Sequence, residues 1–142
     1  MNAEDCACPC GNVAFSISGP PLFRVLCHCT ICQRFNDAPF ADVAIYDGSL
    51  VGEPRPGTVD YATYKPPPNL QRGKCAACGA AAIEKFAVPL LPRLTIVPAA
   101  VHSSGADIPA PKAHMFYGTR KADAADALPK HVGFIASQLG KL

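Results

Sequence analysis

Residues 75–79 read Cys-Ala-Ala-Cys-Gly, and the spacing of the two thiols is that of a zinc knuckle. In such a turn both sulfur atoms reach one metal ion, and the trailing Gly79 accepts a backbone conformation that other residues resist. A second pair, Cys8 and Cys10, is followed by Gly11 in the same way. Together the two pairs supply four thiolates, so the sequence predicts a closed structural zinc site that joins the N-terminal segment to the middle of the chain.

The third cysteine cluster is a triplet, formed by Cys27, Cys29 and Cys32. Three thiolates leave one position of a tetrahedral zinc open to water or substrate, which is the arrangement of a catalytic site. Such a zinc is a weak Lewis acid for water, but it binds a soft ligand and keeps a bound sulfur as thiolate. No Glu or Asp stands in an HExxH-like or HxE setting that would supply a base for hydrolysis. We therefore predict a catalytic zinc on the triplet, with a small thiol as its natural fourth ligand.

The redox state of the cell compartment determines whether closely spaced cysteines form disulfides or bind metals. The N-terminus has no basic and apolar export segment, so we expect a cytoplasmic protein, in which such thiols are metal ligands or catalytic groups. The alternative is a secreted domain held by disulfides, and the missing export signal disfavours it. The eighth cysteine, Cys6, alternates with Cys8 and Cys10 and is either an unliganded thiol or an alternative metal ligand.

The composition favours short strands and turns over long helices. The 142 residues include 15 Pro and 11 Gly but no Trp, and 49% of them are apolar. This length suits one domain with a modest core, and we expect a single, mainly β domain over residues 1–142. Residues 65–69 and 103–111 are expected as loops, and the tail from 124 to 142 has weak helical periodicity. Strands are expected over residues 13–18, 22–26, 40–46, 59–64, 80–86, 94–97 and 113–117, with one or two helical turns over residues 30–35.

Charge and hydropathy limit the partners of this chain. The formal net charge is +2, and the Lys and Arg residues are scattered instead of clustered as a nucleic-acid surface requires. The apolar stretches are interrupted by Pro or polar residues well before the roughly 20 residues of a membrane span. We therefore predict a small-molecule substrate as the partner, and neither nucleic acid nor a membrane.

Several polar residues are candidates for the surroundings of the triplet. Asn36 and Asp37 follow it closely and are expected near the open coordination position. The segment that returns to the knuckle carries Lys65, Arg72 and Lys74, which either receive the carboxylates of an acidic thiol such as glutathione or are solvated surface charges.

Two histidines also need an interpretation. His28 lies between two thiols in the sequence, so it either points away from them or acts as a proton shuttle or hydrogen-bond donor behind the metal ligands. His114, in the stretch Ala-His-Met-Phe-Tyr, is expected to be a packed strand histidine.

The three clusters, in this order, resemble the glutathione-dependent formaldehyde-activating enzyme family, which also includes centromere protein V-like proteins. The combined pattern CxCG, CxCxxC and CxxCG is specific, and the resemblance covers roughly residues 8–118. The matching stretches are CPCGNVAF at 8–15, CHCTICQR at 27–34, APF at 38–40, CAACG at 75–79 and HMF at 114–116.

This resemblance implies a fold, a reaction and a set of site residues. The fold is a β-tent type single domain of small antiparallel sheets, clasped by a structural zinc, with few short helices. The reaction joins glutathione and formaldehyde into S-hydroxymethylglutathione and is classed with the carbon–sulfur lyases. The resemblance assigns Cys8, Cys10, Cys75 and Cys78 to the structural zinc, and Cys27, Cys29 and Cys32 to a catalytic zinc near a glutathione site.

The sequence departs from the family pattern at three places. Asp37 stands where Gly is common, residues 65–68 replace a Ser-rich loop, and Lys74 replaces an aromatic residue before the knuckle. The metal framework is intact while the substrate side is altered. We therefore expect a zinc-dependent carbon–sulfur lyase-like enzyme acting on a thiol or thiol adduct. The alternatives are a zinc enzyme of this family that acts on another small carbonyl metabolite without glutathione, and a non-catalytic zinc-stabilised binding module.

Overall fold

Short strands separated by turns make up most of the chain in the computed structural model, which describes residues 4–103 and 108–133. In this part of the chain, no helix is long and apolar enough to cross a membrane. The elements are β1 (Glu4–Ala7), β2 (Ala14–Ile17), β3 (Phe23–Cys27), α1 (Thr30–Asn36), β4 (Ala41–Asp47), η1 (Gly48–Leu50), β5 (Val59–Ala62), β6 (Leu70–Cys75), β7 (Ala81–Phe86), β8 (Leu94–Pro98), η2 (Ala99–Val101), β9 (His114–Met115) and η3 (Tyr117–Thr119).

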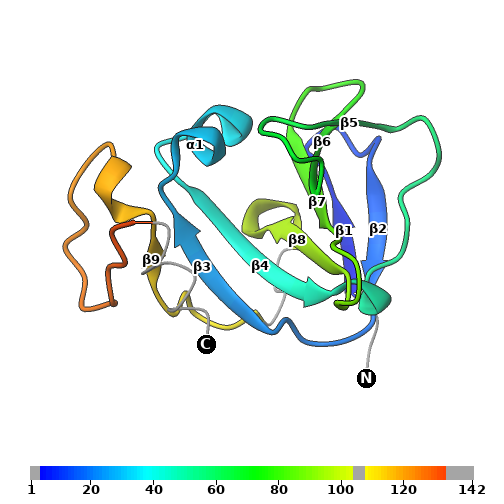
Figure 1. Ribbon diagram of the computed structural model, residues 1–142. Coiled ribbons are helices and arrows are strands. Elements are labelled where there is room, and N and C mark those ends of the chain that lie inside the picture. Colours follow the sequence, from blue (N-terminus) through cyan, green and yellow to red (C-terminus); the bar gives the residue numbers. More distant parts are fainter. Residues whose placement is uncertain (1–3, 104–107, 134–142) are drawn as a thin grey trace.

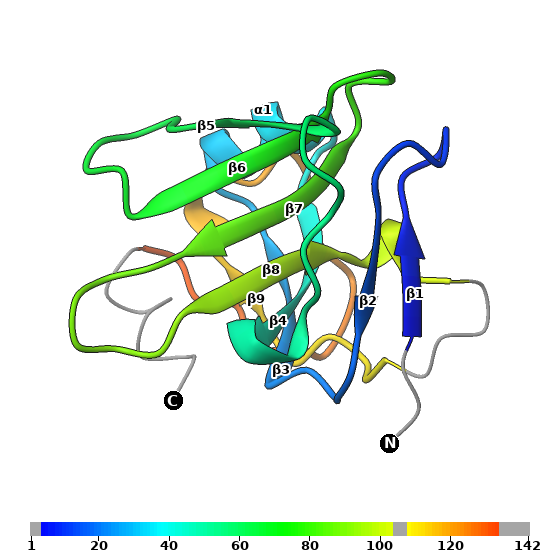
Figure 2. The same cartoon turned by 90° about the vertical axis from the view of Figure 1, so that its right-hand side faces the viewer.

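The strands form two sheets. β1 and β2 make a two-stranded antiparallel sheet, and the other strands form a seven-stranded sheet in the order β5-β6-β7-β8-β4-β3-β9. In Figure 1 the large sheet is strongly curved, so that β3 and β4 lean toward β5, β6 and β7. Helix α1 lies at the upper end of β3 and β4. Figure 2 shows β6, β7 and β8 side by side, with the β1–β2 pair beside them.

Each cysteine cluster is anchored in a different hydrophobic core. The first core packs β2, β4 and β7 together through fully buried side chains that include Ile17, Tyr46 and Ile83, and it contains Cys8 and Cys75. The second core lies between β3, β4 and β9 and contains the buried Cys32 together with Val25, Val43, Ile45 and Met115. Burial of a side chain of this size contributes roughly 1.5–3 kcal/mol. The cores therefore fix one or more thiols of each cluster before any metal binds.

Helix α1 holds two thiols of the triplet in one turn. The Sγ atom of Cys29 caps the helix by accepting the backbone N–H of Cys32 at 3.2 Å. The helix ends at Asp37, which has a left-handed φ of 49°. Gly is favoured at such a position, and Asp is one of the few other residues that tolerate it. Asp37 therefore still ends the helix, although Gly is common at this position in the family.

The predicted mainly β fold is confirmed; besides β1 (Glu4–Ala7), which lies outside the predicted strands, it shows three differences. Strand β6 was not predicted, because Gln71, Arg72, Gly73 and Lys74 have low strand propensity; it forms because it pairs with β5 on one side and β7 on the other. The large sheet is also not purely antiparallel, since β3 and β9 run parallel.

The third difference concerns the C-terminal part. The predicted strand over residues 113–117 shortens to His114–Met115, since Phe116 takes a positive φ of 53° and turns the chain into η3. The weak helical periodicity from residue 124 produces no helix over residues 124–133, and residues 134–142 lie outside the described part of the chain. Of the predicted loop over residues 103–111, residues 104–107 also lie outside it.

Replacing Gly73 by Ala tests the close packing of the unpredicted strand. A Cβ atom at this position would lie 2.5 Å from Val59 Cγ1 and 2.9 Å from the backbone oxygen of Ile83, which cannot move freely. We expect Gly73→Ala to lower the free energy of unfolding by about 1–3 kcal/mol, measured by chemical denaturation. Gly133→Ala is the matched control, because a Cβ there meets nothing within 4 Å. Equal stability of the two variants would contradict the packing described for β6.

Candidate metal and active site

The two cysteine pairs meet in one cluster, as the sequence predicts. The Sγ atoms of Cys8, Cys10, Cys75 and Cys78 all lie within 4.8 Å of one another. The separations Cys8–Cys10 and Cys10–Cys75 are both 3.6 Å, close to the ~3.8 Å between sulfurs in a tetrahedron with metal–sulfur bonds of about 2.3 Å. The cluster joins the turn after β1 to the turn between β6 and β7.

Backbone N–H groups point at the sulfurs of this cluster. Cys75 Sγ accepts the N–H groups of Ala77 and Cys78, each at 3.3 Å, and Cys8 Sγ accepts that of Val13 at 3.3 Å. The backbone hydrogen bond from Cys78 lowers the pKa of Cys75 to about 6, although burial opposes it. The turns thus favour the thiolate form, which binds a metal, at Cys8 and Cys75.

The thiols of Cys27, Cys29 and Cys32 form the second cluster, also within 4.8 Å of one another. The Sγ atoms of Cys32 and Cys27 are 3.2 Å apart. Cys32 is buried, whereas Cys27 and Cys29 are partly exposed. Three sulfurs with an exposed side fit a metal that keeps one position for a ligand from solvent.

The ionisation of the triplet also suits a cation. Hydrogen bonds from the thiols of Cys27 and Cys32 lower the pKa of Cys29 to about 3. The hydrogen bond with Cys29 raises the pKa of Cys27 to about 12, and the hydrogen bond with Cys27 raises the pKa of Cys32. These shifts favour a thiolate at Cys29 that is hydrogen-bonded by the other two thiols. A divalent ion would allow all three to ionise, so the soft donor set fits a thiophilic metal.

Arg72 and Glu84 form a buried ion pair beside the triplet. They face each other directly across β6 and β7, and Arg72 Nη1 lies 2.5 Å from Glu84 Oε1. The same Nη1 donates to Cys32 Sγ at 3.8 Å. Burial raises the pKa of Glu84 to about 7, although the charge of Arg72 opposes the shift. The interpretation of Arg72 as a solvated surface charge is therefore wrong, because its side chain is buried against a thiol of the triplet.

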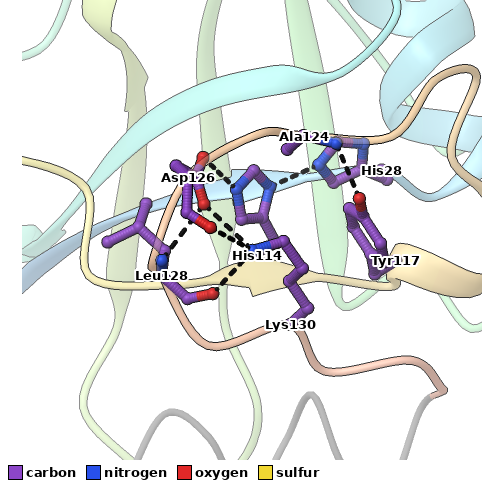
Figure 3. Close-up of polar contacts among 7 residues, drawn as sticks. All are labelled: His28, His114, Tyr117, Ala124, Asp126, Leu128 and Lys130. Carbon is purple, nitrogen blue, oxygen red and sulfur yellow. Dashed lines mark hydrogen bonds and ion pairs between the residues drawn. The ribbon is translucent and has the colours of Figure 1, made fainter.

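His28 belongs to a chain of hydrogen bonds with His114 and Asp126 (Figure 3). Its Nε2 lies 2.8 Å from Nδ1 of His114, and Nε2 of His114 lies 2.8 Å from Oδ2 of Asp126. Asp126 is also paired with Lys130. The hydrogen bond from His114 lowers the pKa of Asp126 to about 2, so this carboxylate is ionised and accepts. His114 is a packed strand histidine, as expected, but it is also part of this chain.

The direction of these hydrogen bonds fixes the protons on the rings. Since Asp126 accepts from Nε2 of His114, a singly protonated His114 has a bare Nδ1, which must accept from Nε2 of His28. The Nδ1 atom of His28 is then an acceptor, and within the described residues it is buried without a hydrogen-bond partner. The ring packs against Phe40, Tyr117 and His114. His28 therefore points away from the thiols, the first of the two readings of its sequence position.

The backbone between the thiols is held as firmly as the side chains. The carbonyl oxygen of His28 accepts from Gln33 Nε2 and from Thr119 Oγ1, each at 2.8 Å. The N–H of His28 donates to Met115 O at 2.8 Å. These contacts connect the Cys27–Cys29 segment to α1 and η3 and so fix its path.

The other sequence candidates lie in different surroundings. Asn36 donates to the carbonyl of Cys32, Lys65 is exposed, and Lys74 lies over the ring of Phe35. Cys6 is 1% exposed in the first core and belongs to neither cluster, which favours packing over metal binding. Lys74 and Arg72 line an open pocket of about 480 Å³ on β5 and β6, together with Asp60, Tyr61, Ala62, Tyr64 and the knuckle residues 75–79.

Sequence reasoning missed Glu84 and Asp126 as parts of this site. Glu84 directly follows the apolar run of Ala81, Ala82 and Ile83, and an acid inside a strand expected to be buried is a signal for a buried partner. Asp126 carries no comparable signal, because the periodicity of its segment is weak and gives no reason to expect a buried partner.

A mainly β fold with two cysteine clusters at metal-ligand spacing defines a metal-binding β protein. The chain belongs to the glutathione-dependent formaldehyde-activating enzyme family, whose profile matches residues 3–119. This membership supports a function related to glutathione and formaldehyde. No curated protein matches the chain. Among solved structures, a crystal structure of a Rhodobacter sphaeroides protein is similar in fold, with a TM-score of 0.56 at 17% identity, over 72% of this chain and 90% of that chain.

The buried glutamate predicts a specific pH dependence of stability. Because the pKa of Glu84 is about 7 in the folded protein and near 4.5 when exposed, the folded state binds more protons between these values. The free energy of unfolding should therefore fall as pH rises from about 4.5 to 7, by on the order of 3 kcal/mol from this group. Glu84→Gln removes this titration, so the difference in free energy of unfolding between variant and wild type should shift in favour of the variant as the pH rises through this range, measured by denaturant titration at each pH.

Glu53→Gln serves as the control, because Glu53 is an exposed glutamate that is ion-paired with Lys85. Its stability should follow wild type across the same pH range. A Glu84→Gln variant whose stability runs parallel to wild type would show that Glu84 does not titrate there.

Proposed function

We propose that this protein is a zinc-dependent carbon–sulfur lyase-like enzyme that acts on a thiol or thiol adduct such as S-hydroxymethylglutathione. One observation carries the proposal. In a member of the formaldehyde-activating family, three thiols lie within one ligand sphere, and two of them, Cys27 and Cys29, are partly exposed. The need for reduced thiols is compatible with the cytoplasm.

The two clusters would hold two zinc ions with different roles. When bound at the triplet, zinc supplies an open coordination position that keeps a substrate sulfur in the thiolate form. The other zinc closes the fold and has no open position, because all four of its ligands come from the protein. Its ligands would be Cys8, Cys10, Cys75 and Cys78.

The proposed reaction needs no oxidant or reductant. In the synthetic direction, the thiol gives up its proton and its sulfur forms a bond to the carbonyl carbon of formaldehyde. The electron pair of the C=O bond moves to oxygen, which takes up one proton and becomes the hydroxyl of the adduct. The reverse direction breaks the same carbon–sulfur bond.

The residues of the chain supply positioning and charge for this step. Gln33 and Thr119 hold the backbone between Cys27 and Cys29 in place. Preorganisation of this kind contributes to catalysis, because the reacting groups need no further ordering. Lys74 lines the pocket next to Arg72 and offers a cation for a carboxylate of the substrate.

Cys32→Ser tests the catalytic role of the triplet. We expect the variant to lose turnover of glutathione and formaldehyde, followed by the NMR signal of the S-hydroxymethyl adduct against the uncatalysed rate. Its fold and one zinc per chain should remain, because Cys32 lies outside the four-thiol cluster. Wild type should bind two zinc ions per chain, one of which is removed by mild chelation.

Cys6→Ser is the matched control, since this buried cysteine belongs to neither cluster. It should keep both zinc ions and full turnover. A fully active Cys32→Ser protein with two zinc ions would overturn the proposal.

Calorimetric titration with glutathione tests the substrate class. We expect binding at or below millimolar concentration to the two-zinc protein, and a much weaker response to S-methylglutathione, which has no free thiol. Absence of binding by glutathione would favour the alternative in which a small carbonyl metabolite reacts without it. Two zinc ions without turnover of either kind of substrate would favour a zinc-stabilised binding module.

A further inference from the structure

The ion pair between Arg72 of β6 and Glu84 of β7 is buried next to the cysteine triplet. The guanidinium of Arg72 is bonded to Glu84 and reaches Cys32 Sγ with the same Nη1 atom. Arg72 is 8% exposed and Glu84 is 3% exposed, so little solvent screens the guanidinium from the thiol. The arrangement brings a permanent positive charge against the most buried sulfur of the cluster.

The guanidinium is held in this place from several sides. It lies over the rings of Phe35 and Tyr64, at 5.8 and 6.0 Å from their centroids. Phe35 comes from α1, the helix that also carries Cys32, and Tyr64 follows β5. The helix and the β5–β6 part of the sheet therefore meet around Arg72.

Stability of the fold alone does not account for such a pair. Burying two charges costs free energy that their attraction often fails to recover, and apolar residues of similar size are frequently as stable. Three thiolates on a divalent ion, by contrast, carry a net negative charge that is also costly to bury. A fixed cation beside the buried thiolate offsets that cost, and a carboxylate behind it fixes the orientation of the guanidinium.

We propose that Arg72 is the positioning residue that retains Cys32, and with it the metal, in the triplet, and that Glu84 acts only by orienting Arg72. The inference rests on the zinc site of the proposed function. It makes Cys32 the ligand at the back of the site. An incoming sulfur then approaches from the side of Cys27 and Cys29, the two partly exposed thiols.

The test measures metal release from the zinc-loaded protein. Arg72→Met with Glu84→Met in one variant removes both charges without leaving either one unpaired, so the protein should fold and melt like wild type. The more labile zinc should pass to a chromogenic chelator at least about 10-fold faster than from wild type, as expected when a contact behind a metal ligand is lost. The tightly held zinc should be unaffected.

Two further variants separate charge from packing. Arg72→Lys keeps the positive charge and should recover part of the slow release, whereas Glu84→Gln keeps Arg72 but loses the carboxylate that orients it, and should release metal at a rate between those of wild type and the double variant. The matched control is Arg24→Met with Asp42→Asn, which removes a cross-strand ion pair of β3 and β4 that contacts none of the seven clustered thiols in the described hydrogen bonds. This control should not change release.

Wild-type release from a folded variant that lacks both Arg72 and Glu84 would overturn the inference while leaving the zinc site intact. A wild-type chain that binds one zinc per chain would overturn the proposed zinc enzyme and this inference together. The two failures are therefore distinct.

Discussion

The structure brings two short cysteine pairs, far apart in the sequence, into one cluster whose four Sγ atoms lie within 4.8 Å of one another. Sulfurs that share a tetrahedral zinc lie about 3.8 Å apart, and the metal–ligand distances vary by only about 0.2 Å. The turns that present Cys8, Cys10, Cys75 and Cys78 must therefore be rigid, and backbone N–H groups aimed at the sulfurs make them so. β1 with β2 and β6 with β7 are the supports of these turns, and the first core fills the space between them.

The triplet of Cys27, Cys29 and Cys32 is assembled in a different way. Its three thiols come from one local segment, so no distant pairing is needed to assemble them, but they need help from elsewhere to stay in place. The charge comes from Arg72 on β6, and the backbone contacts come from Gln33 and Thr119. The His28, His114 and Asp126 chain connects the same segment to the C-terminal part of the described protein. The thiols of this site thus come from one short segment, whereas the residues that contact and orient them come from distant parts of the chain.

This difference explains how much the sequence could predict. The thiol clusters and the mainly β fold follow from spacing and composition, because Cys-x-x-Cys-Gly and alternating apolar residues are local signals. The burial of Arg72 was not predicted, either as a carboxylate receptor or as a surface charge, because residues 70–75 lack a strand pattern and form a strand only by pairing with β5 and β7. The role of Asp126 likewise could not be predicted, because it depends on a hydrogen bond to His114, twelve positions away, which local sequence patterns do not indicate. Supports of a site are set by tertiary pairing, and that information is spread over the whole chain.

The parallel pairing of β3 with β9 has a consequence for the order in which the protein is made. Cys27 pairs with Met115 in the register of these strands, and His114 bonds onward to Asp126. On the ribosome, the complete triplet emerges before Cys75 and well before β9. At about 5–20 residues per second, its thiols spend several seconds in solution without their strand partner. A nascent chain therefore presents the complete triplet to the cell before Cys75 and Cys78 can complete the four-thiol cluster, and early capture of a metal ion would shield the triplet thiols from oxidation until the rest of the sheet has been synthesised.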